Sequence, residues 1–394
     1  MKKQLLFMAL VGLITSMVSA ADLHVRNLGA GGAYATVGAA ITAAANGDRI
    51  IIQPKTNGTA YVENLTINKS LTFVSETIYN KYFIQGSINI TPSAGRVVTF
   101  NNLSSGNFTI YNVTVTGATT GGRTTVNLYN CYLNNVDGSF PNTTTNISGC
   151  NVIGYIAISH GRVTGNTSGS LSAYSQGTDT SLATSDVEFI GNATTSGITN
   201  QQDSYNFKFW NNFTSGIYAY KIKAGGSDEI INNTIYQPNG GDVAPIYIDI
   251  ANANTAGNIT IMNNAVSFVV GQTTACIEYY GIATVTATYN VFTNAFVTSG
   301  SPITQSNNTG AVNMSFNNTT YTVTGGNVNA GNPSVLYTDL DLTRNDAGHY
   351  GGSNSWANYW GPDSGAMPQI NYLVTPRQIL NTSTLNVTGS GFSK

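Results

Sequence analysis

The chain has 394 residues, of which only 9% are charged, and its 16 basic and 18 acidic side chains give a net charge of −2. An ordinary soluble domain carries about 25% charged residues. A nucleic-acid binder is excluded because it needs a basic surface that displaces counterions from phosphate. A helical bundle is excluded because the polar residues are mainly Asn, Thr and Ser, together with 42 Gly, while 41% of the chain is hydrophobic. This composition predicts a large all-β protein with many turns.

The first twenty residues have the pattern of an export signal. Lys2 and Lys3 precede an apolar run from Leu5 to Val18, and small residues follow up to Ala20. This arrangement is typical of a secretory signal peptide. We therefore expect cleavage after Ala20 and a secreted, extracellular or cell-surface location. No later stretch is long and apolar enough to predict a transmembrane segment.

A short helix is predicted near the amino terminus of the exported part. Val37, Ala40, Ile41 and Ala44 have helical spacing, and Asn46-Gly47 is a stop signal. Short apolar strands follow this segment in the sequence. An amphipathic helix in front of the first strands would cover backbone groups that are otherwise unpaired at the open end of a repeat fold.

A repeated phrase runs through the middle of the chain: an alternating apolar stretch followed by one or two asparagines. The asparagines that mark it are Asn130, Asn151, Asn192, Asn212, Asn233, Asn264, Asn290 and Asn317. Their spacing is 20 to 31 residues, except for one step of 41 that equals about two units. Repeats of this length with short strands are typical of a solenoid. We predict a right-handed, single-stranded parallel β-helix of about ten to twelve turns.

Asparagine suits the corners of such a helix, because it tolerates a left-handed backbone and its amide can bond the same amide one turn away. The predicted ladders explain how the chain is polar with so few charges. Cys131 and Cys150 are 19 positions apart, which is one turn, so they are expected to be stacked neighbours. Their spacing leaves two alternatives open, a disulfide bridge or two buried thiols, and Cys276 has no partner at this spacing.

Two stretches carry a resemblance to a known group. The segments 34–41, 47–50, 61–65 and 69–73 resemble the start of pectin-lyase-like right-handed parallel β-helix proteins, and 339–352 is similar to a closing motif of secreted bacterial members. The resemblance covers roughly residues 22 to 365 and implies the fold; the group contains lyases, hydrolases, esterases, adhesins and tailspikes. The expected organisation is a signal peptide at 1–20, a cap and first coils at 21–80, coils at 81–335, a closing segment at 336–365, and a tail, linker or incomplete β module at 366–394.

The enzyme signatures of this group are incomplete in the sequence. The phrase typical of pectin methylesterases and the Arg-x-Pro-x-x-Arg strand of pectate lyases are missing. The Ser159-His160-Gly161 and Lys221-Ile222-Lys223 phrases resemble half of the polygalacturonase pattern, without the paired aspartates that supply general acid and base. His160, Lys221 and Lys223 are therefore the catalytic candidates. The alternative for His160 is a polar residue at a turn.

The few charges cluster at two sets of repeat positions. Glu188, Lys208 and Glu229 each stand four positions before an asparagine marker, which predicts an outward ladder of alternating sign. A second set would face outward if Ile222, Ile248 and Ile277 face inward, and its members are Lys221, Lys223, Tyr247, Asp249 and Glu278. These five are the predicted ligand-binding residues, with the tyrosine packing on a sugar ring. Exposed cross-strand ion pairs without a ligand are the alternative for both sets.

The carboxyl-terminal motif contains Asp339, Asp341, Asn345 and Asp346, whose oxygens are close in sequence as in a calcium loop. The alternative is a turn in which the carboxylates accept backbone N–H bonds. Neighbouring Trp356, Tyr359 and Trp360 are expected to cover the carboxyl-terminal end of the core.

Three functions are compatible with these features. The first is a secreted or surface protein that binds polysaccharide or a neighbouring surface without catalysis and without a cofactor. The second is a polysaccharide lyase or glycoside hydrolase, and the third is a purely structural stalk. The expected partner is an extracellular glycan, with no nucleic acid.

Overall fold

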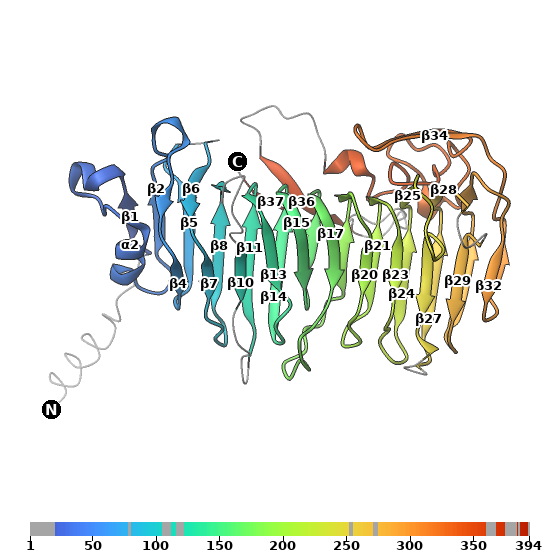
Figure 1. Cartoon of the computed structure of the whole chain (residues 1–394), viewed down its shortest axis with the longest axis horizontal. Coiled ribbons are helices and arrows are strands. Elements are labelled where there is room, and N and C mark those ends of the chain that lie inside the picture. Colours follow the sequence, from blue (N-terminus) through green and yellow to red (C-terminus); the bar gives the residue numbers. More distant parts are fainter. Residues whose placement is uncertain are drawn as a thin grey trace.

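The computed structural model describes residues 20–77, 80–104, 112–115, 122–251, 255–270, 275–359, 368–374, 384 and 387–392. The predicted signal sequence, apart from Ala20, lies outside the described residues. The described chain is an elongated stack of coils, in which strands of successive turns lie side by side from the amino-terminal end to β32 and the last coil (Figure 1). The prediction of a parallel β-helix is confirmed.

The first strand of each coil belongs to the first face, a 13-stranded parallel sheet. Its strands, in order, are β1 (Asp22–Val25), β2 (Arg49–Ile52), β5 (Leu71–Ser75), β8 (Val97–Asn101), β11 (Thr124–Tyr129), β14 (Thr143–Ser148), β16 (Arg162–Thr164), β18 (Val187–Ile190), β21 (Phe207–Trp210), β24 (Ser227–Ile231), β27 (Asn258–Met262), β30 (Thr284–Thr288) and β33 (Thr304–Ser306).

The other strands form a second and a third face, which join because β15 and β17 each run around the corner between them. The second face contains β3 (Tyr61–Val62), β6 (Tyr82–Gln85), β9 (Leu103–Ser104), β12 (Tyr132–Leu133), the first parts of β15 (Asn151–Ile158) and β17 (Thr167–Ala173), β19 (Ala193–Thr194), β22 (Phe213–Thr214), β25 (Thr234–Gln237), β28 (Ala265–Phe268) and β31 (Val291–Phe292). The third face contains β4 (Leu65–Ile67), β7 (Ile88–Ile90), β10 (Asn112–Val115), β13 (Asn135–Gly138), the second parts of β15 and β17, β20 (Ile198–Asn200), β23 (Ile217–Ala219), β26 (Ile246–Asp249), β29 (Ile277–Tyr280) and β32 (Thr298–Gly300).

The short helix α2 (Val37–Ala43) covers the amino-terminal end of the stack, as predicted (Figure 1). Thr36 caps it by accepting a hydrogen bond from the Ala39 N–H, and Val37, Ala40 and Ile41 are buried. The 3₁₀ turns η1 (Asn27–Gly32) and η2 (Thr56–Gly58) lie in the neighbouring connections. The helix therefore buries its apolar stripe against the first coils.

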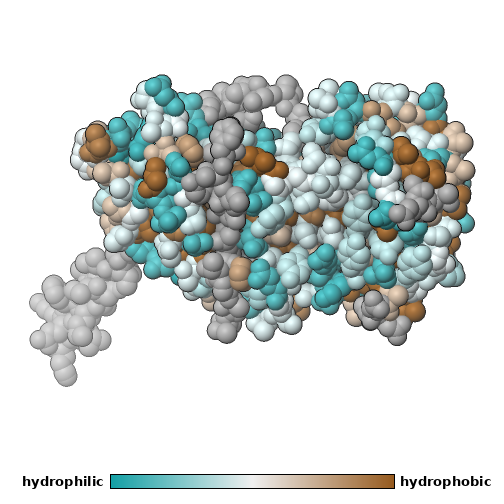
Figure 2. Space-filling model, in the orientation of Figure 1, coloured by the Kyte–Doolittle hydropathy of each residue, from teal (hydrophilic) through white to brown (hydrophobic). Residues whose placement is uncertain are grey.

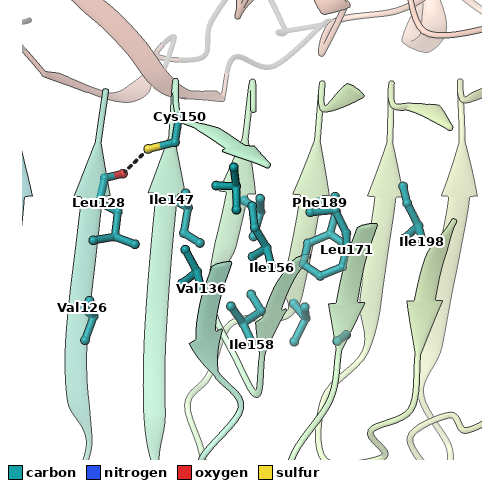
Figure 3. Close-up of a cluster of buried hydrophobic side chains, with 14 of the residues drawn as sticks. Val126, Leu128, Val136, Ile147, Cys150, Ile156, Ile158, Leu171, Phe189 and Ile198 are labelled. Carbon is teal, nitrogen blue, oxygen red and sulfur yellow. Dashed lines mark hydrogen bonds between the residues drawn. The ribbon is translucent and has the colours of Figure 1, made fainter. Parts of the chain in front are cut away.

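One continuous apolar core fills the inside of the coils, because alternate residues of most of the short strands point inward. Identical or similar side chains stack from coil to coil. Phe73 lies on Phe100 with ring centroids 4.6 Å apart, and Phe189 lies on Phe209 at 5.1 Å. Figure 3 shows part of this core, with Leu128, Ile147 and Ile156 among the stacked aliphatic side chains.

A buried asparagine ladder occupies the corner between the first and second faces. In each step one amide Nδ2 donates to the Oδ1 of the next coil, at 2.8 to 3.1 Å, and the members are Asn166, Asn192, Asn212, Asn233, Asn264, Asn290 and Asn308. The same Oδ1 atoms accept backbone N–H bonds, and each Nδ2 also donates to a carbonyl of the preceding coil, as Asn212 does to Phe189 at 2.8 Å. The ladder is thus buried inside the corner and does not lie on the surface. Of the predicted marker asparagines, Asn130, Asn151 and Asn317 are not among its members.

Cys131 and Cys150 extend this ladder toward the amino terminus. The Cys150 Sγ accepts the Cys131 N–H at 3.2 Å and donates to the Leu128 carbonyl at 3.5 Å, which are the roles of an asparagine amide (Figure 3). Both cysteines are free thiols and are buried. Of the two alternatives for this pair, the structure therefore has buried, stacked thiols.

The residue just before each inward ladder position lies outside the same corner and has a left-handed backbone. It is glycine at positions 149, 165 and 191, tyrosine at Tyr289, and otherwise asparagine, with φ of 51° to 58° at Asn130, Asn211, Asn232, Asn263 and Asn307. Left-handed backbone is routine only for glycine and, among other residues, mainly for asparagine and aspartate. The Asn-Asn pairs of the sequence therefore place one amide outside and one inside.

The outer amides bind a return segment, residues 313–359, which runs back along the side of the stack. Asn211 Nδ2 donates to the carbonyls of His349 and Gly351, at 3.1 and 2.7 Å, and Asn232 Nδ2 donates to the Asp346 carbonyl at 2.9 Å. Its elements are the antiparallel hairpin β34 (Met314–Asn317) and β35 (Thr322–Gly325) and the turns η4 (Val335–Tyr337) and η5 (Trp356–Asn358).

The described part of the predicted closing segment, 336–365, belongs to this return segment, and its position differs from the expected one over the carboxyl-terminal end of the core. The segment lies along the side of the coils, above β21 to β28, and not at the carboxyl-terminal end (Figure 1). Trp356 packs with Ala193 and Phe213 of the second face, and Tyr359 lies over Gly191, where an added Cβ would be 2.6 Å from its ring. Trp360 lies outside the described residues. Covering the end of the core is therefore not the role of Trp356 and Tyr359.

The described parts of the tail form a second hairpin, β36 (Gln369–Val374) and β37 (Thr388–Phe392). Phe392 is buried and stacks on Tyr129 of the first face at 5.0 Å. This part of the tail packs against the coils.

Candidate functional site

A row of tyrosines crosses the outer surface of the third face. Tyr218 on β23 pairs in register with Tyr247 on β26, which pairs with Glu278 on β29. The ring of Tyr247 is 6.1 Å from that of Tyr220 and 6.2 Å from that of Tyr280. The short strands alternate inward and outward residues, so in-register stacking places these rings on one side.

Below these rings is a shallow hollow with a cavity volume of about 550 Å³. We call it the third-face depression; it is lined by Asp242, Val243, Tyr247, Asp249, Ala251, Glu278 and Tyr280. The Tyr247 hydroxyl donates to Asp249 Oδ2 at 3.2 Å. Burial and the adjacent Asp249 carboxylate raise the pKa of Tyr247 to about 12, so the hydroxyl stays protonated at neutral pH. Tyr247, Asp249 and Glu278 thus come together as predicted, in a site where the lining residues that the structure describes include three carboxylates and no cation.

The two lysines of the predicted site do not line this depression. Strand β23 ends at Ala219, which pairs with Ile248, so Lys221 and Lys223 belong to the next corner. Both are exposed, and Lys221 Nζ is 3.8 Å from Asp203. The assumed register of Ile222 with Ile248 is therefore wrong. Ile222 is buried like a strand residue, so the sequence pattern does not reveal that β23 has already ended at Ala219.

His160 is buried, 2% exposed, in a polar cluster beside the first face. Its Nδ1 is 3.0 Å from Thr144 Oγ1, its Nε2 is 3.0 Å from the Ser185 carbonyl, and its ring packs on Tyr205. Burial lowers the pKa of His160 to about 4, with Arg123 contributing. The structure places it at a corner in contact with protein groups, away from the third-face depression.

Arg123 is the centre of that cluster. It forms an ion pair with Asp179 at 2.9 Å and donates to the Tyr205 hydroxyl at 2.8 Å. These contacts hold the connection between β17 and β18 against the coils. A buried charge with its partners satisfied is typical of a structural clamp.

The outward charge ladder has the predicted register. Glu188 pairs with Lys208, which pairs with Glu229, and Arg162 adds a fourth rung beside Glu188. Lys208 Nζ is 2.9 Å from Asp186 and 3.9 Å from Glu188. Burial raises the pKa of Glu229, while Lys208 opposes this change. The side chains form cross-strand ion pairs.

The carboxylates of the carboxyl-terminal motif hold backbone turns. Asp339 accepts the N–H groups of Gly352 and Asp346, at 2.6 and 2.9 Å, and Asp341 accepts the Thr343 N–H at 3.0 Å. Asp346 accepts the Asn329 N–H at 2.6 Å. Among the described residues no group of three or more His, Cys, Asp or Glu side chains is arranged to hold a metal ion. These contacts match the alternative to a calcium loop, in which the carboxylates accept backbone N–H bonds within a turn.

The predicted site does not include two lining residues, Tyr280 and Asp242, or Tyr220, whose ring lies beside Tyr247 in the tyrosine row. Tyr280 follows Glu278 by two positions and therefore shares its face, which is a usable signal. Asp242 comes from the long connection between β25 and β26, whose path the repeat does not specify.

Comparison of the chain with protein-family models, with curated proteins and with solved structures found no significant match. Every helix in the described part of the chain is too short or too polar to cross a membrane.

Proposed function

We propose that this protein is an exported, non-catalytic β-helix of the pectin-lyase-like type that binds extracellular polysaccharide on its third face. The observation that carries the proposal is the tyrosine row, whose ring centroids are 6.1 and 6.2 Å apart, above a depression with convergent polar groups. Aromatic faces pack on the C–H surfaces of sugar rings, and polar groups at the rim fix their orientation.

The charges of the depression select the kind of polysaccharide. Asp242, Asp249 and Glu278 accept hydrogen bonds, and no cationic side chain is among its lining residues. A uronate polymer would meet like charge there, whereas sugar hydroxyls and ammonium groups would be favourable donors. The proposed ligand is therefore a neutral or amino-sugar polysaccharide. Export is inferred from the signal pattern at residues 1–20.

The surface composition supports the same proposal. Much of the face in Figure 2 is pale, with strongly hydrophilic and strongly hydrophobic residues in small scattered groups. Serine, threonine and tyrosine are near the middle of the hydropathy scale, and their hydroxyls are neutral donors and acceptors that suit an uncharged sugar chain.

The test is a binding screen of the exported protein against immobilised neutral, amino-sugar and uronate polysaccharides, followed by titration calorimetry. Tyr247→Ala, and Asp249→Asn combined with Glu278→Gln, should each weaken binding, while Tyr174→Ala is the control, at an exposed tyrosine of the same face two coils before Tyr220 and outside the depression. Release of reducing ends or unsaturated products would favour an enzyme. A blank screen would favour the structural stalk.

A further inference from the structure

A second cavity lies on the other side of the connection between β25 and β26, where the return segment folds over the second face. Its volume is about 440 Å³, within the range of about 300–1,000 Å³ for small-molecule sites. We call it the hairpin pocket; its lining residues include Phe213, Tyr218, Tyr236, Gln237, Asn318 and Tyr321. None of the side chains that line it is charged. The third-face depression, with three carboxylates, is a different environment.

The walls of the pocket come from parts of the chain about a hundred residues apart. Tyr321, between β34 and β35, packs on Phe213 of β22 with centroids 5.5 Å apart. Phe316 of β34 stacks on Tyr236 of β25 at 5.3 Å and 10°. The Tyr321 carbonyl is 2.9 Å from His349 Nε2, which fixes the hairpin to the return segment. The pocket therefore exists because the return segment covers this stretch of coils.

The ring of Tyr218 occupies space that two glycines leave open. A Cβ on Gly197 would come 2.4 Å from the Tyr218 ring, and one on Gly216 would come 2.2 Å from its hydroxyl. Only residues without a side chain allow the ring to lie there. The ring is half-buried there and hydrogen-bonded with Gln237, so this aromatic surface is in place before a ligand arrives, which reduces the entropy cost of binding.

Gln237 supplies a polar group that lacks a partner. Its side chain is hydrogen-bonded with Tyr218, but its buried Oε1 has no donor among the described residues. A buried acceptor without a donor costs about 1–3 kcal/mol. By contrast, Thr194 and Thr214 on the floor bond each other at 2.8 Å and bond neighbouring carbonyls, so they are already satisfied.

From these features we infer that the hairpin pocket binds one or two rings of an uncharged saccharide. The aromatic rings match the apolar faces of sugar rings, and a sugar hydroxyl would donate to Gln237 Oε1 once the amide, whose oxygen is enclosed in this structure, turns toward the cavity. An anionic or cationic ligand would lose its hydration without meeting an opposite charge in the lining. The hairpin pocket is separate from the third-face depression, so either site could bind without the other.

The experiment uses the full exported chain and titrates it with neutral hexasaccharides of glucose, mannose and galactose, and with hexagalacturonate. Gln237→Ala should weaken the best neutral ligand about tenfold, because a bond to a buried acceptor is lost. Gly216→Ala should weaken it as well, because the Tyr218 ring must move. Gln305→Ala, at an exposed glutamine of β33, is the matched control. Circular dichroism and a thermal melt of each variant show that it is folded.

The two proposals fail in different ways. Weakening by Gln237→Ala and Gly216→Ala but not by Tyr247→Ala supports the hairpin pocket and counts against the third-face site. Weakening by Tyr247→Ala alone overturns the hairpin pocket. The hairpin-pocket proposal is also overturned if no neutral hexasaccharide binds or if hexagalacturonate binds as tightly as the neutral ligand. A strong fall of the neutral ligand's affinity with added salt would overturn it too, because only charge-based binding depends on salt in this way.

Discussion

Asn232 and Asn233 are consecutive in the chain, yet their amides bond on opposite sides of the same corner. Asn232 Nδ2 donates outward to the Asp346 carbonyl at 2.9 Å, and Asn233 Nδ2 donates inward to Phe209 O at 2.7 Å and to Asn264 Oδ1 at 3.1 Å. The left-handed backbone of Asn232, with φ of 55°, turns the chain between them. The pair therefore joins the coil to both its neighbours and the return segment.

Removing an inner amide should be costly. Asn233→Ala leaves Asn212 without its acceptor and the Phe209 carbonyl without a donor, so we expect a loss of about 3–4 kcal/mol in the free energy of unfolding. Chemical denaturation of Asn233→Ala is to be compared with Asn151→Ala, an exposed asparagine for which we expect a change within about 0.5 kcal/mol. Equal effects of the two variants would show that the ladder does not stabilise the corner.

The thiol positions should accept an asparagine. In Cys150→Asn the amide would accept the Cys131 N–H and donate to the Leu128 carbonyl, and its Nδ2 would also face Asn166 Oδ1. We expect Cys150→Asn to keep or raise the melting temperature, whereas Cys150→Leu should lower it by several degrees because it leaves these backbone groups unpaired. The melting curves decide the matter, and a Cys150→Asn variant as unstable as Cys150→Leu would contradict the equivalence of thiol and amide here.

Asp228 should make stability depend on pH. It is 1% exposed on β24, its Oδ1 accepts the Phe207 N–H at 2.7 Å, and burial raises its pKa to about 7. In the unfolded chain the pKa is about 3.9, so between about pH 4 and 7 the unfolded state loses its proton first and stability falls as pH rises.

Asp228→Asn removes this titration while keeping an acceptor for Phe207. We expect the free energy of unfolding of the variant to exceed that of the original chain by a few kcal/mol at pH 8, since each unit of pKa shift corresponds to about 1.4 kcal/mol. Near pH 4 the two free energies should differ little. Denaturation curves at several pH values measure the difference, and a gain independent of pH would refute the assignment to Asp228.

His349 should fix the return segment. It is fully buried, its Nδ1 is 2.7 Å from Thr234 Oγ1, and its Nε2 donates to the Tyr321 carbonyl. His349→Ala breaks both links, so trypsin should cut after Arg344 faster than in the original chain, while cleavage after the exposed Lys221 stays the same. Mass spectrometry of the fragments follows both sites. His24→Ala, at a histidine of the first coil, serves as the matched control, and an unchanged rate after Arg344 would rule out this anchoring role.

The repeat and its inward residues could be predicted because a period-two alternation and regular asparagines are local signals. Which asparagine of a pair faces inward could not be predicted, since this depends on the left-handed residue before it; Asn151 fits the marker pattern although it is exposed. The same limit explains Lys221: Ile222 is buried, but it lies beyond the end of β23 at Ala219 and is out of phase with the inward Ile217 and Ala219. Tyr247, Asp249 and Glu278 were found because all three lie within paired strands. The path of the return segment has no local signal, because Asn211 and His349 are 138 positions apart.

The return segment also changes how the molecule should come apart. In a simple solenoid each repeat contacts only its neighbours, so coils can fray one by one from an end. Here 313–359 holds the coils of Asn211, Asn232 and Asn263 at the same time. A coil in this stretch cannot open until the segment detaches, so these coils should unfold together as one cooperative block, and the coils nearer α2 should be free to exchange their amide hydrogens separately.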